Sequence, residues 1–196
     1  LDPTAAHPSA SAFLERMDVV RTADFTVDAE RSQSLFGEFF CDLDPEMGKT
    51  RLSALSTPGM VVALDAEVTG SPRWVVLRLE LGKATFQPGD VLGVVCRGSA
   101  DGAREVGLLL RMVRDGVLAD TRLDDGLSLA SKEGVVTALH TLSALDPAIG
   151  AEGDCALILA LPVESCRILI QDLAFFVLPA EAGLRSTPID LGSFAA

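Results

Sequence analysis

The stretch RWVVLRLELGKATFQPGDVLGVVCR, residues 73–97, contains two apolar runs separated by the turn signal QPGD. In the first run apolar and polar side chains alternate, which is the two-residue period of a β-strand with one buried face. The positions predicted to face inward are Val75, Leu77, Leu79 and Leu81, and those predicted to face outward are Trp74, Arg78 and Glu80. Pro88-Gly89 gives the turn its backbone geometry. The stretch therefore predicts two short strands joined by a reversal of the chain.

The same pattern continues on both sides of this stretch. Further strands are predicted at residues 24–29, 60–68, 104–113, 117–122, 135–143, 155–161 and 166–178. Turn sequences such as RDG and LDDG separate them, and no long helix lies between them. Short strands in close succession are typical of an antiparallel sandwich or barrel, and about eight such segments suit a jelly roll. We predict an all-β fold, an antiparallel jelly-roll β-sandwich with a short N-terminal helix.

Three regions of a single domain, residues 1–196, differ in character. Residues 1–50 are predicted to form a helix and a strand extension. Ser9 or Ser11 can cap the helix, which continues to about Arg21. Residues 59–179 are predicted to form the sandwich core, and residues 180–196 an extended tail on its surface. Because no internal repeat and no linker is visible, we expect one domain.

Composition excludes several partners. The formal net charge of −12 opposes nucleic acid and anionic membranes, because both reward a basic patch. The uncharged runs at 53–64, 135–145 and 155–163 are shorter than the roughly 18 to 20 apolar residues that a spanning helix needs. The first twenty residues lack the basic leader and apolar run of a signal peptide. The sequence begins with Leu1, so processing upstream stays open.

The four cysteines are Cys41, Cys96, Cys155 and Cys166, without the spacing of a zinc site. Residues 155–161 and 166–178 are predicted to form a hairpin with the loop PVES. In that hairpin Cys155 and Cys166 lie at different rungs. We therefore expect reduced, buried cysteines and a reducing compartment such as the cytoplasm.

Two segments carry a resemblance to a known family. Residues 74–100 have an apolar strand, a Phe-x-Pro-Gly-Asp turn at Phe86–Asp90 and a second apolar strand. Ile170, Gln171, Asp172 and Leu173 stand where such folds often close with an Ile-Asp-Asp-Val-like sequence. Both segments resemble the galactose-binding-like jelly roll of bacterial carbohydrate-binding modules. The resemblance implies two antiparallel sheets, a sugar-binding face or edge, often a structural calcium ion, and no other cofactor.

Asp172 is an acid within an apolar strand, and alternation places it on the same face as Ile168, Ile170 and Phe176. We therefore expect it to point inward. The family resemblance implies that it ties the closing strand to the N-terminal region, through backbone amides or a structural cation. We expect an anchor for the fold and no catalytic role.

Other acidic and nucleotide-like motifs are weak. GKT at 48–50 lacks the first glycine of a phosphate loop. Asp42, Asp44 and Glu46 alternate as cation ligands can, but the EF-hand pattern is missing, and we expect a solvated acidic turn. The acids of 123–125, with Asp120 and Glu133, could supply carboxylates for glycoside cleavage. His140 has only His7 as a fellow histidine, so we expect a structural role.

Outward positions of several strands gather into one candidate ligand site. Its proposed members are Trp74, Arg78, Arg97 and Arg111, with His140 and Gln171 as further candidates. If their strands are neighbours, an aromatic plane and guanidinium groups would suit a saccharide, including an acidic one. The alternative is a solvated face with Arg–Glu pairs, such as Arg78 with Glu80 or Glu105.

Three functions are consistent with these observations. The first is a non-catalytic carbohydrate-binding-like module or an accessory protein of glycan metabolism, with a saccharide as partner. The second is a protein-interaction subunit that forms homo-oligomers. The third is a glycoside-active hydrolase.

Overall fold

The computed structural model describes residues 7–180, which form one helix and thirteen strands. The elements are α1 (Pro8–Thr22), β1 (Phe25–Ala29), β2 (Gln33–Phe36), β3 (Phe39–Leu43), β4 (Gly48–Ser56), β5 (Val62–Gly70), β6 (Val75–Ala84), β7 (Val91–Ala100), β8 (Arg104–Arg114), β9 (Val117–Arg122), β10 (Leu127–Leu129), β11 (Gly134–Thr141), β12 (Gly153–Ala160) and β13 (Cys166–Leu178).

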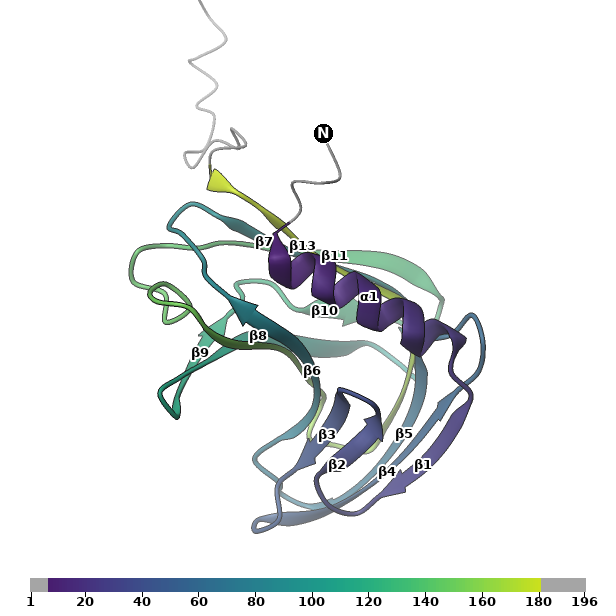
Figure 1. The fold of residues 1–196 in the computed structure, drawn as a ribbon. Helices are drawn as coiled ribbons and strands as arrows, with labels where there is room; N and C mark the ends of the chain where they lie inside the picture. The colour runs from purple at the N-terminus through teal and green to yellow at the C-terminus, as the bar shows by residue number, and fades with distance from the viewer. Residues whose placement is uncertain (1–6, 181–196) are drawn as a thin grey trace, which may run out of the picture.

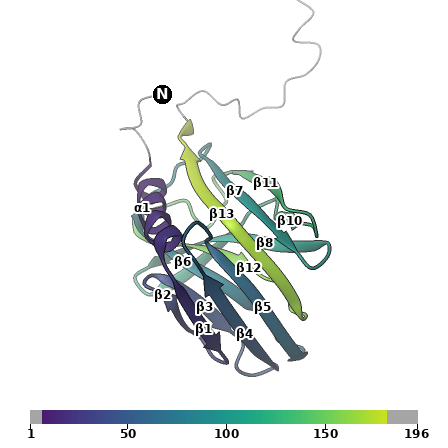
Figure 2. The same ribbon diagram turned by 90° about the vertical axis from the view of Figure 1, so that its right-hand side faces the viewer.

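The strands form two antiparallel sheets that stack as a sandwich (Figures 1 and 2). One sheet has six strands in the order β1-β4-β5-β13-β7-β11. The other has seven, in the order β10-β8-β12-β6-β3-β2, with β9 paired to β8. The predicted all-β jelly-roll sandwich with an N-terminal helix is therefore confirmed.

The stretch at residues 73–97 forms β6 and β7, and each strand belongs to a different sheet. The four predicted inward positions of β6 are at most 2% exposed, so alternation identified the buried face correctly. Gly89 has a φ of 92°, a backbone conformation that glycine adopts without strain. The buried Asp90 carboxylate accepts hydrogen bonds from the amides of Gln87, at 2.8 Å, and Ala180, at 2.9 Å. The turn therefore fixes the crossing between the sheets and the end of β13.

Helix α1 contacts β6 and β13, one strand from each sheet. Figure 1 shows it, in purple, crossing in front of the strands. Phe13 is fully buried and packs on Phe175 of β13, with ring centroids 5.8 Å apart. The cap differs from the prediction, because His7 is the N-cap and Pro8 starts the helix. Proline favours this position since its fixed φ is helical and its missing amide needs no partner.

The sequence analysis did not predict strands β2, β3 and β4. They lie within residues 33–56 and join both sheets, with β4 between β1 and β5 and with β3 beside β6. The two sheets therefore include residues that precede the predicted core of 59–179. The predicted surface tail at 180–196 lies outside the described residues from position 181 onward.

The predicted hairpin of residues 155–161 and 166–178 is wrong. Strand β12 lies between β8 and β6 in the seven-stranded sheet, whereas β13 lies between β5 and β7 in the other sheet. Residues 161–165 therefore connect the two sheets. Both strands are central, so each has two other partners and neither needs a hairpin neighbour.

Asp172 does not point inward as alternation predicted. A register shift between Ile170 and Asp172 interrupts the alternation, and the Asp172 side chain is 54% exposed. Its carboxylate accepts hydrogen bonds from Arg21 of α1, at 2.7 and 2.9 Å. The expected tie to the N-terminal region is thus made by a guanidinium, which occupies the place proposed for a structural cation. Nowhere within residues 7–180 do three His, Cys, Asp or Glu side chains gather as metal ligands.

The four cysteines are free and buried, as predicted. Burial raises the pKa of the Cys96 and Cys155 thiols to about 12, because an apolar interior disfavours the thiolate. Helix α1 is too short and too polar to cross a membrane, and it is the single helix described between residues 7 and 180.

Candidate functional site

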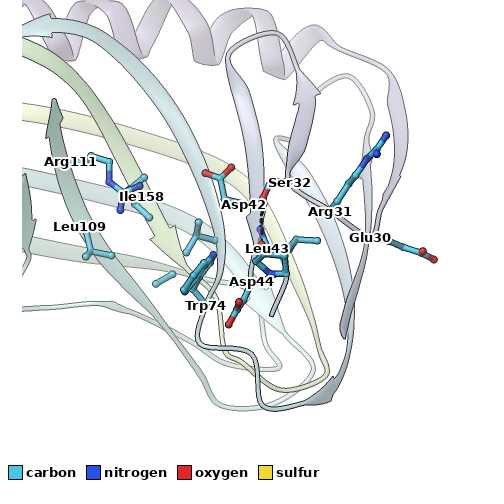
Figure 3. A pocket seen from close by; sticks show the side chains of 13 residues that line it. Glu30, Arg31, Ser32, Asp42, Leu43, Asp44, Trp74, Leu109, Arg111 and Ile158 are labelled. Carbon is cyan, nitrogen blue, oxygen red and sulfur yellow. Dashed lines mark hydrogen bonds between the residues drawn. The ribbon is translucent and has the colours of Figure 1, made fainter. Parts of the chain in front are cut away.

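The outer face of the seven-stranded sheet carries a groove of about 790 Å³. It is lined by residues of β3, β6, β8 and β12 and by the turn between β1 and β2. Figure 3 shows Trp74 between two groups of side chains, Leu109, Arg111 and Ile158 on one side and Asp42, Leu43 and Asp44 on the other. The groove exists because these strands are neighbours and their outward positions lie side by side.

The floor of the groove is apolar. Val76, Ala156 and Ile158 form a small buried cluster on the outer side of the sheet, with Leu109 and Ala160 packed against it. Ile158 is only 2% exposed. Sheet faces in contact with water usually carry polar side chains at such positions. This apolar floor can therefore contact an apolar surface of a ligand.

Trp74 stands at one end of this floor and is 37% exposed. The guanidinium of Arg73 lies 4.4 Å from the centroid of the indole ring, a cation–π contact. The Trp74 carbonyl accepts a hydrogen bond from the Asp44 amide at 3.2 Å. Backbone and side-chain contacts therefore hold the indole in place before any ligand arrives.

Asp44 anchors this end of the groove. Its side chain is fully shielded from solvent, and two nitrogens of Arg73 donate to its two oxygens at 2.8 and 2.9 Å. The amides of Arg73 and Glu46 donate to the same carboxylate. These hydrogen bonds, foremost those from the Arg73 side chain, hold the pKa of Asp44 well below its ordinary value of 3.8.

Arg78 occupies the middle of the outer face. Its Nε donates to Asp42 of β3 at 2.7 Å, and its Nη1 donates to Glu80 of the same strand. The guanidinium also lies 4.4 Å from the centroid of the Phe40 ring. The predicted pairing of Arg78 with Glu80 is therefore present, and Asp42 adds a second partner.

Arg111 forms a bidentate pair with Asp120 of β9, with both donor–acceptor distances at 2.7 Å. The Asp120 hydrogen bonds raise the pKa of Arg111, and the nearby charge of Asp42 adds to this effect. A second hollow of about 280 Å³ lies beside the groove and shares Asp42 and Arg111 with it. Charged pairs therefore flank the apolar floor.

Three of the four predicted ligand residues lie on this face: Trp74, Arg78 and Arg111. Arg97 does not, because β7 belongs to the six-stranded sheet, where Arg97 pairs with Glu133 at 2.6 Å. Gln171 also lies in that sheet and donates to the Gly59 carbonyl at 2.7 Å. Alternation predicted the outward faces of Trp74, Arg78, Arg97 and Arg111 correctly, but it could not predict which strands are neighbours.

The predicted outward position of His140 is wrong, because this residue lies in the six-stranded sheet with its side chain on the buried side of β11, 6% exposed. Its Nδ1 is 3.0 Å from an Asp124 oxygen, whereas its Nε2, 3.5 Å from Asp146, has no hydrogen-bond partner among the described residues. The ring thus links the loop at Asp124 to β11. His7 stacks on Phe86, with ring centroids 4.8 Å apart, so the two histidines have separate local partners.

The sequence analysis did not assign the apolar floor to the ligand site. It also did not assign Asp42 and Asp120 to that site. Ile158 and Leu109 come from strands whose apolar character extends to both faces. The expected solvated acidic turn at Asp42, Asp44 and Glu46 is wrong for Asp44, which is buried, and an arginine contacts each of the three acids. Asp120 and Glu133 were considered together as catalytic acids, but Asp120 pairs with Arg111 and Glu133 with Arg97. One feature of the sequence could have revealed the floor. The run at 155–161 is apolar at consecutive positions, so the strand it forms has apolar side chains on both faces.

No protein-family model and no curated protein sequence matches the chain. Solved structures with a similar chain path include the N-terminal cellulose-binding domain of a β-1,4-glucanase from Cellulomonas fimi, with 13% identity, 65% of this chain and 82% of that chain covered, and a TM-score of 0.44. A xylan-binding domain from Paenibacillus barcinonensis has 10% identity, coverage of 81% and 97%, and a TM-score of 0.41. An endoglucanase from Trichoderma harzianum has 7% identity, coverage of 79% and 98%, and a TM-score of 0.45. Carbohydrate-binding modules are among the similar structures.

Proposed function

We propose that this protein binds a saccharide in the groove and does not cleave it, as a carbohydrate-binding module or an accessory protein of glycan metabolism. The observation that carries the proposal is the combination of a partly exposed indole, an apolar floor and flanking charged pairs in one groove.

A sugar ring presents C–H groups on its faces and hydroxyl groups around its edge. Trp74 and the floor at Val76 and Ile158 suit the ring face, because an aromatic plane offers a large apolar contact. The Asp42 and Arg111 side chains suit the hydroxyls, since a carboxylate accepts and a guanidinium donates hydrogen bonds. The groove is therefore matched to the two kinds of surface that a saccharide carries.

Binding without cleavage is supported by the state of the carboxylates. Glycoside hydrolysis needs one carboxylic acid that keeps its proton, which requires a raised pKa. Asp44 has the opposite shift, because Arg73 stabilises its charged form. Asp42 is hydrogen-bonded to Arg78 and serves as its charge partner. These acids fit structural and recognition roles better than proton transfer.

A glycan array that carries neutral and acidic oligosaccharides tests the proposal, followed by calorimetry on each bound glycan. We expect at least one specific hit. We expect Trp74→Ala to weaken its binding by about tenfold or more, because stacking contributes on the order of 1 kcal/mol and the lost apolar burial adds to it. Trp74→Phe keeps an aromatic ring and is the matched control, with a smaller loss.

An array without any hit would contradict saccharide binding. In that case the alternative is assembly of identical chains. Val135 is 68% exposed and Leu139 47% exposed on the outer side of the edge strand β11, and large exposed apolar side chains occur at interfaces. A stable dimer in light scattering, together with an empty array, would favour this function over saccharide binding.

A further inference from the structure

Two arginines of the outer sheet face, Arg78 and Arg111, are already neutralised. A third, Arg31 on the turn between β1 and β2, lies at the edge of the groove, and its side chain points away from Trp74 (Figure 3). Arg111 donates to both oxygens of Asp120 at 2.7 Å, and Arg78 donates to Asp42 and Glu80. The side chains of Arg78 and Asp42 are only 23% and 26% exposed, and those of Arg111 and Asp120 are 30% and 33% exposed. Partial burial strengthens such pairs relative to fully exposed ones. Neither guanidinium therefore offers an uncompensated positive charge to a ligand.

Carboxylates outnumber guanidinium groups along the groove and the adjoining hollow. The whole chain also carries a formal net charge of −12. An anionic ligand would meet repulsion at long range and would have to displace Asp42 or Asp120 to reach Arg78 or Arg111. A hydroxyl group has no such difficulty, because it donates to the carboxylate and accepts from the guanidinium of the same pair.

From this charge pattern we infer that the groove selects uncharged saccharides over those that carry carboxylate or sulfate groups, and that Asp42 and Asp120 are the residues that exclude the acidic ones. The inference rests on the proposed saccharide binding and adds the class of saccharide. It replaces the expectation that paired arginines mark a site for acidic sugars. The two aspartates act on specificity by occupying Arg78 and Arg111, which would otherwise bind an anion.

The test compares matched glycans that differ in charge, such as hexamers of β-1,4-linked glucose and glucuronate, and of β-1,4-linked mannose and mannuronate, within the same array. We expect the unmodified protein to bind uncharged glycans and to leave the uronates unbound. The double variant Asp42→Asn/Asp120→Asn removes the charge partner of Arg111 and leaves Arg78 with Glu80 alone, with little change of shape. It should gain affinity for a uronate hexamer by about tenfold or more, since a hydrogen bond to a charged group contributes about 1.5 to 3 kcal/mol.

Asp28→Asn/Asp65→Asn is the charge-matched control. Asp28 lies beside Arg51 and Ser53, and Asp65 pairs with Arg167, all on the six-stranded sheet. This variant changes the net charge equally, so it should gain no uronate binding if the effect is local. Thermal unfolding of both variants reports whether they fold.

The outcomes separate the inference from the proposed function. Acidic glycans bound by the unmodified protein as tightly as neutral ones would overturn the inference and leave saccharide binding intact. Neutral binding with no gain in a folded Asp42→Asn/Asp120→Asn variant, or an equal gain in the control, would overturn the role of the two aspartates. If the unmodified protein binds no glycan of the array, the proposed function itself is overturned.

Discussion

The Asp44 carboxylate is shielded from solvent yet charged, because its surroundings replace water with hydrogen-bond donors. Two nitrogens of the Arg73 side chain and the amides of Arg73 and Glu46 all donate to it. Arg73 in turn covers the indole of Trp74. Asp44 and Arg73 are 29 positions apart in the sequence, so no local sequence pattern could predict their contact. At the level of single residues, the sequence identified Trp74 but not the pair that supports it.

We expect Asp44→Asn to lower the Tm by several degrees at pH 7, because Arg73 loses its buried charge partner and keeps only the exposed Glu46. The folded-state pKa of Asp44 lies below its ordinary value of 3.8, so its stabilising effect is fully present above about pH 4 and is lost as the pH falls through the folded-state pKa. The Tm difference between the two proteins should therefore stay constant from pH 7 to pH 5 and shrink below pH 4. A difference that grows on acidification would contradict this role.

At the level of elements, apolar runs predict the positions of strands better than alternation predicts the direction of every side chain. Residues 166–178 were predicted as a strand and form β13 with the same bounds. The hairpin of β2 and β3 was missed, because each strand has at most five residues and few alternating positions. Asp172 was placed on the wrong face, since an added residue in one strand moves every later side chain to the other face.

The register shift turns Asp172 outward, where it contacts Arg21 of α1, and the effect of this contact on stability can be measured. We expect Asp172→Ala to cost about 1 kcal/mol, because Arg21 and Asp172 are partly exposed and their pair is screened by water. For a chain of this size that corresponds to a Tm lower by about 2–4 °C, with glycan binding unchanged because the helix contact lies outside the groove. Differential scanning calorimetry measures the shift.

Asp65→Ala is a suitable control for this experiment. The Asp65–Arg167 pair joins β5 and β13, which are already connected by backbone hydrogen bonds, so its loss should matter less. An unchanged Tm for Asp172→Ala would show that the contact does not anchor the helix. A simultaneous loss of glycan binding would show that α1 helps to shape the groove.

For the whole molecule, the sequence predicted the layers but not the order of strands within them. Alternation reports which side of a strand is buried, whereas strand order depends on contacts between distant parts of the chain. Arg97 illustrates this limit, because its outward position on β7 was predicted correctly and its sheet was not. The groove is likewise a product of topology. Residues of β3, β6, β8 and β12 come together in it although they are spread from Asp42 to Ala160.

The emission of Trp74 tests saccharide binding in the groove most directly. Trp74 is the only tryptophan, and the chain has no tyrosine, so the protein emission reports this one site. On titration with a glycan that the array identifies, we predict a saturable change in emission and reduced quenching by acrylamide. The fitted Kd should equal the one from calorimetry. A glycan that binds by calorimetry while emission and quenching of Trp74 stay unchanged would contradict the account.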